Sequence, residues 1–125
     1  MDLHIDNIEL QGRLLLVTVS GSVTVDAGLR LFKQVCDTAA ENRVNKILAN
    51  ALAVDGELTT FERYHWGLEA AAYAQQHQMN LRLAIVGKPP TFDGFGVRVS
   101  QNRGSTFELF SSQAEALGWL DRWPN

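Results

Sequence analysis

Residues 81–87 read LRLAIVG, a short apolar run that indicates how the sheet is built. Four apolar residues follow Arg82 without interruption, and a glycine ends the run. A strand with apolar side chains on both of its faces is typical of a sheet that other elements cover on both sides, as they do in parallel sheets. We therefore predict a strand at 81–87 that is covered on both faces.

The N-terminal third of the chain predicts a hairpin followed by a helix. Leu3 to Leu10 and Leu14 to Ser20 have strand-like patterns, and a turn at Gln11-Gly12 separates them. The segment 21–42 predicts a helix that begins after Thr24, because a threonine oxygen can accept from the free amide groups of the first turn. This helix carries an apolar stripe that consists of Leu29, Phe32, Cys36 and Ala39 or Ala40.

A strand at 46–52, KILANAL, and a second helix occupy the chain before LRLAIVG. The helix begins with a capping box, in which the Thr59 hydroxyl accepts from the Glu62 amide and the Glu62 carboxylate accepts from the Thr59 amide. It is predicted to run to about His77. We expect one apolar face to pack on the sheet, and this face consists of Phe61, Tyr64, Leu68, Ala71 or Ala72 and Gln75.

The same helix carries a second stripe, Trp66, Ala70 and Tyr73, which packing on the sheet does not require. Two interpretations are open. We favour the first, in which neighbouring helices cover Trp66 and Tyr73, because large aromatic side chains are mostly buried. In the second, the two rings form an exposed patch that binds a partner protein. In both cases the helix starts at the carboxyl end of a strand, where open α/β sheets place their sites.

The remainder of the chain predicts a helix, a short strand and a last helix. Apolar residues recur at helical spacing within 91–104, and the glycine at its end is suited to terminating a helix. Thr106 to Phe110 predicts a short strand. The segment 111–123 predicts the last helix, which Ser112 and Glu115 start as a capping box.

These elements give the order β-β-α-β-α-β-α-β-α. Strands that alternate with helices are joined by right-handed crossovers, so the sheet is predicted to be mostly parallel. The N-terminal hairpin adds an antiparallel strand at one edge. We predict a small α/β sandwich that forms a single domain over residues 1–125, because a chain of this length builds one sizeable core.

Composition and charge restrict the function. The net charge is −3 and no block of lysine or arginine occurs, so nucleic acid is not an expected partner. The longest apolar runs, such as 14–19, have the length of a strand, and no integral membrane segment is expected. The N-terminus is acidic, unlike a signal peptide, and the single cysteine allows no internal disulfide. We expect a cytoplasmic protein.

Motifs for catalysis, cofactor binding and metal binding are incomplete. The Gly-Lys pair at 87–88 lacks the other residues of a phosphate-binding loop, and the two prolines that follow supply no backbone donors. Glu62 and His65 have the spacing of half a di-iron site, but the second half is missing. Cys36 lies in an apolar stripe and predicts a buried thiol. We therefore expect no enzyme activity, no cofactor and no metal.

The order of elements and several segments together resemble the STAS family, the sulfate-transporter and anti-sigma-factor antagonist domains. The segments are KILANAL (46–52), ELTTFERYHWGLEAA (57–71), RLAIVG (82–87) and NRGSTFELFSSQAEALGWL (102–120). The resemblance is to the SpoIIAA-like bacterial branch, which also shares features with the CRAL-TRIO lipid-transfer fold. It covers nearly the whole chain, and the last segment is its most specific part.

This resemblance implies a non-enzymatic regulatory module in signalling that works by binding another protein. In the anti-sigma-factor antagonists, a serine or threonine at the start of the second helix is phosphorylated by a partner kinase, and this switches binding. The family pattern there is an Asp-Ser or Asp-Thr pair followed closely by glycine, whereas in this chain Gly56 follows Asp55 directly. The expected functional surface comprises Asp55, Thr59, Thr60 and Trp66.

The relation to CRAL-TRIO domains implies a second function, the binding of a lipid or another small hydrophobic molecule. The pocket for this ligand would use Phe92, Phe95 and Trp66. The sequence does not choose between another protein, a lipid and a second copy of the chain as the partner.

Overall fold

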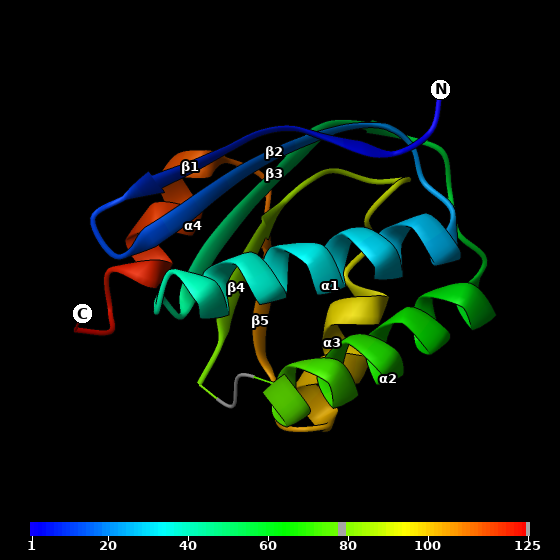
Figure 1. The fold of residues 1–125 in the computed structure, drawn as a ribbon. Coiled ribbons are helices and arrows are strands. Elements are labelled where there is room, and N and C mark those ends of the chain that lie inside the picture. The colour runs from blue at the N-terminus through cyan, green and yellow to red at the C-terminus, as the bar shows by residue number, and fades with distance from the viewer. Residues whose placement is uncertain (78–79, 125) are drawn as a thin grey trace.

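Five strands form one sheet in the part of the chain that the computed structural model describes, residues 1–77 and 80–124 (Figure 1). Their order across the sheet is their order in the sequence. The first strand is antiparallel to the second and every other neighbouring pair is parallel, which confirms the predicted sheet with its antiparallel edge strand. The strands are β1 (His4–Gln11), β2 (Leu14–Ser22), β3 (Lys46–Asp55), β4 (Arg82–Val86) and β5 (Thr106–Phe110).

Helices cover both faces of this sheet. Within the described residues they are α1 (Val25–Glu41), α2 (Thr60–His77), α3 (Phe95–Asn102) and α4 (Gln113–Leu120). Because the strand order never reverses, successive right-handed crossovers bring α1, α2 and α3 to the same face. α4 follows the last strand and packs over β3, β4 and β5 on the other face (Figure 1). The predicted order of elements and the α/β sandwich are confirmed.

The side chains of β4 point alternately into two apolar clusters. Leu83 and Ile85 belong to the larger cluster, which lies between the sheet and the face that carries α1, α2 and α3. Ala84 and Val86 belong to the smaller cluster under α4. This alternation explains the uninterrupted apolar run in the sequence, since each face of the strand is buried by a different layer.

α1 begins and packs much as the sequence predicts. The Thr24 hydroxyl accepts from the Ala27 amide at 3.2 Å, so Thr24 is the N-cap. Of the predicted stripe, Leu29 is only half-buried and Ala40 is exposed. The stripe is therefore rotated by part of a turn, and the buried side chains of the helix are Ala27, Leu31, Phe32, Val35, Cys36 and Ala39.

α2 is rotated about its axis from the predicted orientation, so that Ala71 of the predicted face is buried and Leu68 is half-buried. Phe61 and Tyr64, which we expected to pack on the sheet, are 76% and 40% exposed. The second stripe is instead the covered one: the Trp66 and Tyr73 rings lie edge-on to the Phe32 ring of α1, with centroid distances of 5.8 and 6.5 Å. The interpretation that a neighbouring helix covers Trp66 and Tyr73 is confirmed.

Small residues decide this orientation of α2. The helix packs against α1 and α3, and its buried face includes Gly67, Ala70 and Ala74. A Cβ atom on Gly67 would lie 2.5 Å from the backbone oxygen of Gly96, so α3 approaches α2 at glycine contact distance. Glycine and alanine add little to a hydrophobic pattern. The pattern of large apolar residues in α2 therefore did not predict this close contact.

α3 is shorter than the segment that predicted it. It begins at Phe95, after Gly94 has taken a φ of +86°. This left-handed conformation favours glycine and interrupts the helical spacing, so Phe92 lies in the loop before α3. The glycine that ends the region, Gly104, has a φ of +93°, as expected for a helix terminus.

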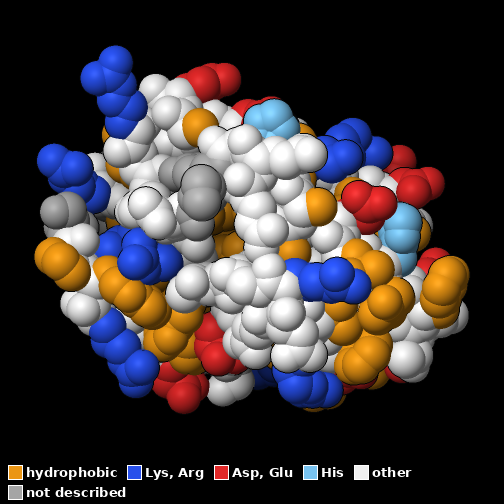
Figure 2. Space-filling view, turned by 90° about the horizontal axis from the view of Figure 1, so that it is seen from below, with side chains coloured by type: hydrophobic (Ala, Val, Ile, Leu, Met, Phe, Trp, Pro, Cys, Tyr) orange, Lys and Arg blue, Asp and Glu red, His pale blue; other side chains and the backbone are white. Residues whose placement is uncertain are grey.

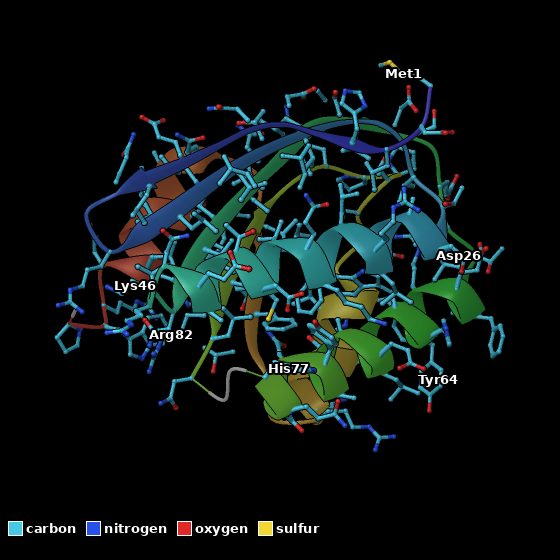
Figure 3. All side chains as sticks on the ribbon, in the orientation of Figure 1. Met1, Asp26, Lys46, Tyr64, His77 and Arg82 are labelled. Carbon is cyan, nitrogen blue, oxygen red and sulfur yellow. The ribbon has the colours of Figure 1, made fainter. Side chains whose placement is uncertain are left out.

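The C-terminal segment after α4 folds back over the amino ends of β3 and β4. The Lys46 ammonium donates to the Trp123 carbonyl oxygen, and the Arg82 guanidinium lies over the Trp123 ring at 4.7 Å. Lys46 and Arg82 lie at the end of the molecule away from the start of α2 (Figure 3). In the part of the chain that is described, no helix has both the length and the apolar character needed to cross a membrane.

Candidate functional site

Two loops meet at the carboxyl edge of the parallel strands. The first runs from the end of β3 at Asp55 to the start of α2, and the second runs from the end of β4 to the start of α3. Parallel strands that are neighbours in a sheet end at the same edge, and open α/β sheets place their sites there. The predicted functional residues, except for Trp66, lie in these loops or at the helix starts that follow them.

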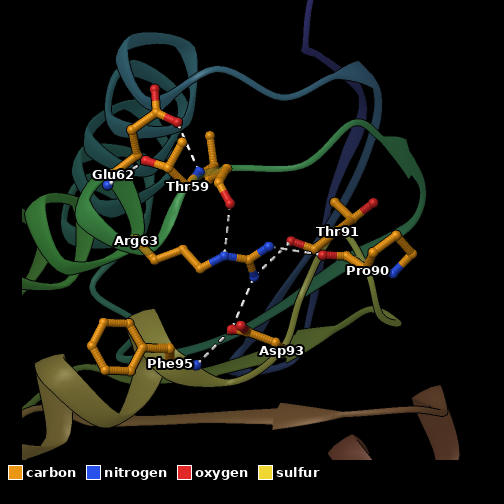
Figure 4. A network of polar contacts seen from close by, with 8 residues as sticks. Thr59, Glu62, Arg63, Pro90, Thr91, Asp93 and Phe95 are labelled. Carbon is orange, nitrogen blue, oxygen red and sulfur yellow. Dashed lines mark hydrogen bonds and ion pairs between the residues drawn. The ribbon is translucent and has the colours of Figure 1, made fainter.

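Thr59 and Glu62 form the predicted capping box. The Thr59 hydroxyl accepts from the Glu62 amide at 3.1 Å, and the Glu62 carboxylate accepts from the Thr59 amide at 2.8 Å (Figure 4). The Thr59 hydroxyl is thus engaged with the backbone. Thr60 is the first residue of α2 and is exposed. Both threonines are exposed, but the Thr59 hydroxyl belongs to the cap, whereas Thr60 lies outside it.

Asp55 joins the ends of two neighbouring strands. Its carboxylate accepts a hydrogen bond of 2.6 Å from the Ser22 hydroxyl, and these two residues pair in the register of β2 and β3. The side chain is exposed. Asp55 therefore presents a fixed negative charge at the carboxyl edge, a few residues before Thr60.

Arg63 binds both loops from the inner side of α2, and the sequence did not identify this residue. Its side chain is 8% exposed. The Nε atom donates to the Leu58 oxygen at 3.0 Å, and the terminal nitrogens donate to the Pro90 oxygen at 2.8 Å and the Thr91 oxygen at 3.3 Å. The guanidinium also forms an ion pair of 2.9 Å with Asp93 (Figure 4). One side chain thus ties the loop before α2 to the loop before α3.

Asp93 is held as a carboxylate at the end of this network. Its Oδ1 atom accepts from the Phe95 amide at 2.9 Å, and this hydrogen bond, with the Arg63 guanidinium beside it, lowers the pKa of the Asp93 carboxyl. Phe95 begins α3, so Asp93 connects the network to the start of that helix. No local spacing marks this pair, because Arg63 and Asp93 are far apart in the sequence.

An apolar cavity of about 150 Å³ lies behind α2. The sheet, α1, α2, α3 and the two loops all contribute to its walls. Trp66 and Phe92 are part of the lining, whereas Phe95 is not among the described residues that line it. The structure thus brings two of the three residues proposed for a hydrophobic pocket to one cavity. The apolar side chains that line it include Val17, Leu31, Phe32, Leu83, Ile85 and Val97.

An exposed surface at the start of α2 combines aromatic and acidic side chains. We call it the aromatic-acidic surface and define it by Asp55, Glu57, Thr60, Phe61 and Tyr64. Figure 2 shows hydrophobic side chains at the surface at the end of the molecule where α2 begins, and in Figure 3 Tyr64 projects away from the helix. Trp66, predicted to share this surface, faces α1 and the cavity instead.

A Ser-His-Asp group on the hairpin does not have the geometry of a catalytic triad. The Ser20 hydroxyl lies 3.2 Å from His4 Nε2, and the Asp6 carboxylate lies 2.8 Å from the same nitrogen. His4 Nδ1 lies 2.9 Å from the Asp2 carbonyl oxygen, and this contact, with Asp6, raises the pKa of His4. In a triad the acid and the hydroxyl bind opposite ring nitrogens, so this arrangement cannot relay a proton from serine.

The remaining reactive groups are also occupied or buried. Burial raises the pKa of the Cys36 thiol to about 11, which disfavours the nucleophilic thiolate. The Glu62 carboxylate, which with His65 has the spacing of half a di-iron site, accepts from the Thr59 amide. No group of three or more His, Cys, Asp or Glu side chains that could hold a metal ion occurs among residues 1–77 and 80–124.

Solved structures identify the fold. The chain superposes on an anti-sigma factor antagonist from Mycobacterium paratuberculosis with a TM-score of 0.65 and 14% identity, over 96% of this chain and 95% of that one. It also superposes on a DUF3478-family protein with a SpoIIAA-like fold from Shewanella loihica PV-4, with a TM-score of 0.53 and 20% identity, over 94% and 93% of the two chains. The protein has a SpoIIAA-like fold.

The SpoIIAA-like fold confirms the architecture that the STAS resemblance implied. No family model matches the sequence, and no curated protein matches it either. At the identities found, the likeness to the solved structures shows the fold alone. What this SpoIIAA-like domain does must therefore be argued from its own surfaces and cavity.

Proposed function

We propose that this SpoIIAA-like domain is a non-enzymatic cytoplasmic regulatory module that binds another protein through its aromatic-acidic surface. The observation that carries the proposal is the exposure of Phe61 and Tyr64, at 76% and 40%, on adjacent turns of α2. Large aromatic side chains supply much of the binding energy in protein interfaces, and they are enriched where a partner removes them from water.

The position of these rings supports an interaction role. They lie at the start of the helix that follows β3, beside the carboxyl edge of the sheet. One protein with the same fold, from Mycobacterium paratuberculosis, is described as an anti-sigma factor antagonist, which acts on another protein. The rings do not contribute to the core clusters of this chain. Binding to a partner is therefore the role that best accounts for their exposure.

Charge indicates the chemistry of the partner. Asp55 and Glu57 are exposed in the segment that leads into α2, and Glu62 lies in the first turn of the helix. Arg63, the nearest cation in the sequence, is buried and paired with Asp93. A matching partner would offer an apolar pocket with lysine or arginine at its rim. A second copy of this chain fits less well, because a two-fold contact would bring the acidic groups of both copies together.

We further propose that Thr60 is the residue at which this binding is switched by phosphorylation. Thr60 is exposed at the start of α2, whereas the Thr59 hydroxyl is engaged in the cap. A phosphate at a helix start is compatible with the helix dipole, so the fold would tolerate it. On the aromatic-acidic surface, however, it would add nearly two negative charges at the centre of the interface.

The function is tested by comparing surface variants in partner binding. The wild-type protein, Phe61→Ala and Gln76→Ala are used to capture proteins from cells of the source organism, and a captured partner is then purified and titrated. We expect Phe61→Ala to weaken binding by about 30-fold, or about 2 kcal/mol, because it removes a central aromatic anchor. Gln76 is exposed at the far end of α2, so Gln76→Ala is the matched control and should bind normally.

Two outcomes would contradict the proposal. The first is that a Phe61→Ala/Tyr64→Ala double variant binds the purified partner as tightly as the wild type does. The second is that no protein binds to the wild type more strongly than to this double variant. Circular dichroism of each variant ensures that a loss of binding is not a loss of folding.

A further inference from the structure

We propose that the apolar cavity behind α2 is a binding site for a small neutral hydrophobic molecule, of the size of one aromatic ring or a short alkyl chain. This inference does not depend on the protein-binding role of the aromatic-acidic surface. It rests on the volume of the cavity, the chemistry of its walls and the pairing of Arg63, the cation among the described residues that line it.

The volume sets the size of the ligand. The cavity holds about 150 Å³. Cavities of about this volume with purely aliphatic and aromatic walls stay dry and bind benzene or xenon. A long acyl chain would not be enclosed. The volume therefore favours a single ring or a few methylene groups over a membrane lipid.

The walls set the polarity of the ligand. The sheet contributes Val17, Leu83 and Ile85, and the helices on this face contribute Leu31 and Val97, all of which are buried. A water molecule in such a space lacks the two to four polar partners that it needs. The space is therefore better filled by apolar atoms than by water. The lining residues that carry polar side-chain groups are Arg63, Trp66, Thr91 and Asp93.

The pairing of Arg63 determines the charge of the ligand. A buried carboxylate or phosphate would need a cation with free hydrogen-bond donors. The Arg63 guanidinium instead donates to the carbonyls of Leu58, Pro90 and Thr91 and pairs with Asp93 at 2.9 Å. Its charge is already compensated by a carboxylate, so an anionic head group gains little there. We therefore infer a neutral ligand.

The same network marks the opening of the cavity. Lining residues with solvent exposure, including Leu58, Thr91 and Asp93, lie in the two loops that Arg63 joins. The interior walls, by contrast, come from buried strands and from α1. A ligand therefore enters between the loop before α2 and the loop before α3, at the carboxyl edge of the sheet.

The proposal is tested by titrating toluene and benzoate into the purified protein and following the methyl resonances of Leu31, Leu83 and Val97 by NMR. The two probes have the same ring, but only benzoate carries a charge. We expect toluene to cause saturable shifts of these methyl groups and to raise the midpoint of thermal unfolding, as a ligand of the folded state does. Benzoate should bind at least about tenfold more weakly.

Variants with larger side chains in the cavity wall test whether toluene binds inside the cavity. Ala51→Leu and Ala49→Leu each add three carbons to the cavity wall from β3, and both should weaken toluene binding by about tenfold or more. Ala40→Leu makes the same change at an exposed position of α1 and should bind toluene normally. Two filling variants are used because either one alone can lose its fold through overpacking.

The outcomes separate the alternatives. If toluene causes no saturable shift in the wild type, the site is overturned. If Ala51→Leu and Ala49→Leu both fold and bind toluene as the wild type does, the ligand sits elsewhere and the assignment is wrong. If benzoate binds as tightly as toluene, the inference of a neutral ligand is overturned. Loss of protein binding by Phe61→Ala is measured separately and does not affect any of these results.

Discussion

Arg63 shows why a charged residue is retained inside the helix layer. Removing a guanidinium from water is costly unless its donors are satisfied and its charge is paired. In this structure three backbone carbonyls and the Asp93 carboxylate meet both requirements. The carbonyls belong to the loop before α2 and the loop before α3, so one side chain joins the two loops. The residue therefore determines the shape of the carboxyl edge, where both the aromatic-acidic surface and the cavity opening lie.

The two adjacent threonines should differ in their effect on stability. Thr59→Ala removes the N-cap of α2 and is expected to lower the free energy of unfolding by about 1 kcal/mol. Thr60→Ala changes an exposed side chain outside the cap and should stay within about 0.5 kcal/mol of the wild type. Urea unfolding of the three proteins measures both changes. Equal destabilisation by both substitutions would show that the cap is not formed by Thr59.

Asp93 should contribute stability that depends on pH. Its pKa in the folded protein is lowered by the hydrogen bond from the Phe95 amide and by Arg63, so folding favours the charged carboxylate. The contribution is fully present above the ordinary aspartate pKa of about 3.9 and is lost as the pH falls through the lower folded-state pKa. Asp93→Asn should therefore destabilise the protein at pH 6, and the difference from the wild type should diminish at pH 3.

The measurement for Asp93 is the urea midpoint of both proteins across this pH range. Because the Asp93 side chain is 50% exposed, the difference should also be smaller at high salt. Glu41→Gln, at the exposed end of α1, controls for the general effect of removing one negative charge. A difference between Asp93→Asn and the wild type that stays constant from pH 6 to pH 3 would contradict the proposed ion pair.

Among the helices and strands, the sequence predicted correctly those features that depend on residues close together in the chain. The caps at Thr24, Thr59 and Ser112 depend on residues three positions apart, and each hydroxyl accepts the expected amide. Which side of α2 is buried depends on the elements that pack against the helix, and the prediction from apolar spacing was wrong for Phe61 and Tyr64 but right for Ala71. The contact of Gly67 with Gly96 is a tertiary feature that no local pattern contains.

This contact makes two glycine-to-alanine substitutions behave in opposite ways. Alanine is the better helix former by about 1 kcal/mol, so Gly118→Ala in α4, where a Cβ atom would meet nothing within 4 Å, should stabilise the protein. In Gly67→Ala the new Cβ atom would lie 2.5 Å from the Gly96 oxygen and 2.7 Å from the Val99 Cβ atom. We expect a loss of about 1–3 kcal/mol from this overpacking. Thermal and urea unfolding measure both variants, and stabilisation by Gly67→Ala would mean that α2 and α3 are farther apart.

At the scale of the whole molecule, the topology could be predicted because it follows from a few strong constraints. Alternating strands and helices with right-handed crossovers leave few arrangements, and the apolar run of β4 requires cover on both faces. The site could be predicted only in part. Its location at the carboxyl edge follows from topology, and Thr59 and Thr60 follow from the cap. The Arg63–Asp93 pair and the cavity arise from residues far apart in the chain, so no local spacing indicates them.

α2 connects the features on which the two proposals rest. Its outer side carries Phe61 and Tyr64, and its inner side contributes Arg63 to the loop network and Trp66 to the cavity wall. The outer residues Phe61 and Tyr64 are each within two positions of an inner residue, Arg63 or Trp66. Substitutions must therefore be chosen on exposed positions if protein binding is to be tested without disturbing the cavity.

Thr60 is such an exposed position. We predict that a negative charge at Thr60 prevents partner binding without unfolding the protein. Thr60→Glu places a carboxylate at the start of α2, where the helix dipole favours it, so the free energy of unfolding should change by less than about 0.5 kcal/mol. The same charge stands next to Phe61, at the centre of the aromatic-acidic surface, where the partner's apolar pocket rather than its basic rim would cover it. Burying an unpaired carboxylate there is costly. We expect at least about a tenfold loss of affinity for the purified partner.

Thr60→Gln is the matched control, because it has the size of glutamate without its charge, and it should bind the partner within about threefold of the wild type. Equal loss in Thr60→Gln and Thr60→Glu would indicate a steric effect and would contradict an electrostatic switch. Mass spectrometry of the protein isolated from the source organism then determines whether Thr60 carries phosphate. If Thr60→Glu binds as the wild type does and no phosphothreonine is found, Thr60 is not a switch. The aromatic side chains next to it would then determine binding without regulation at this residue.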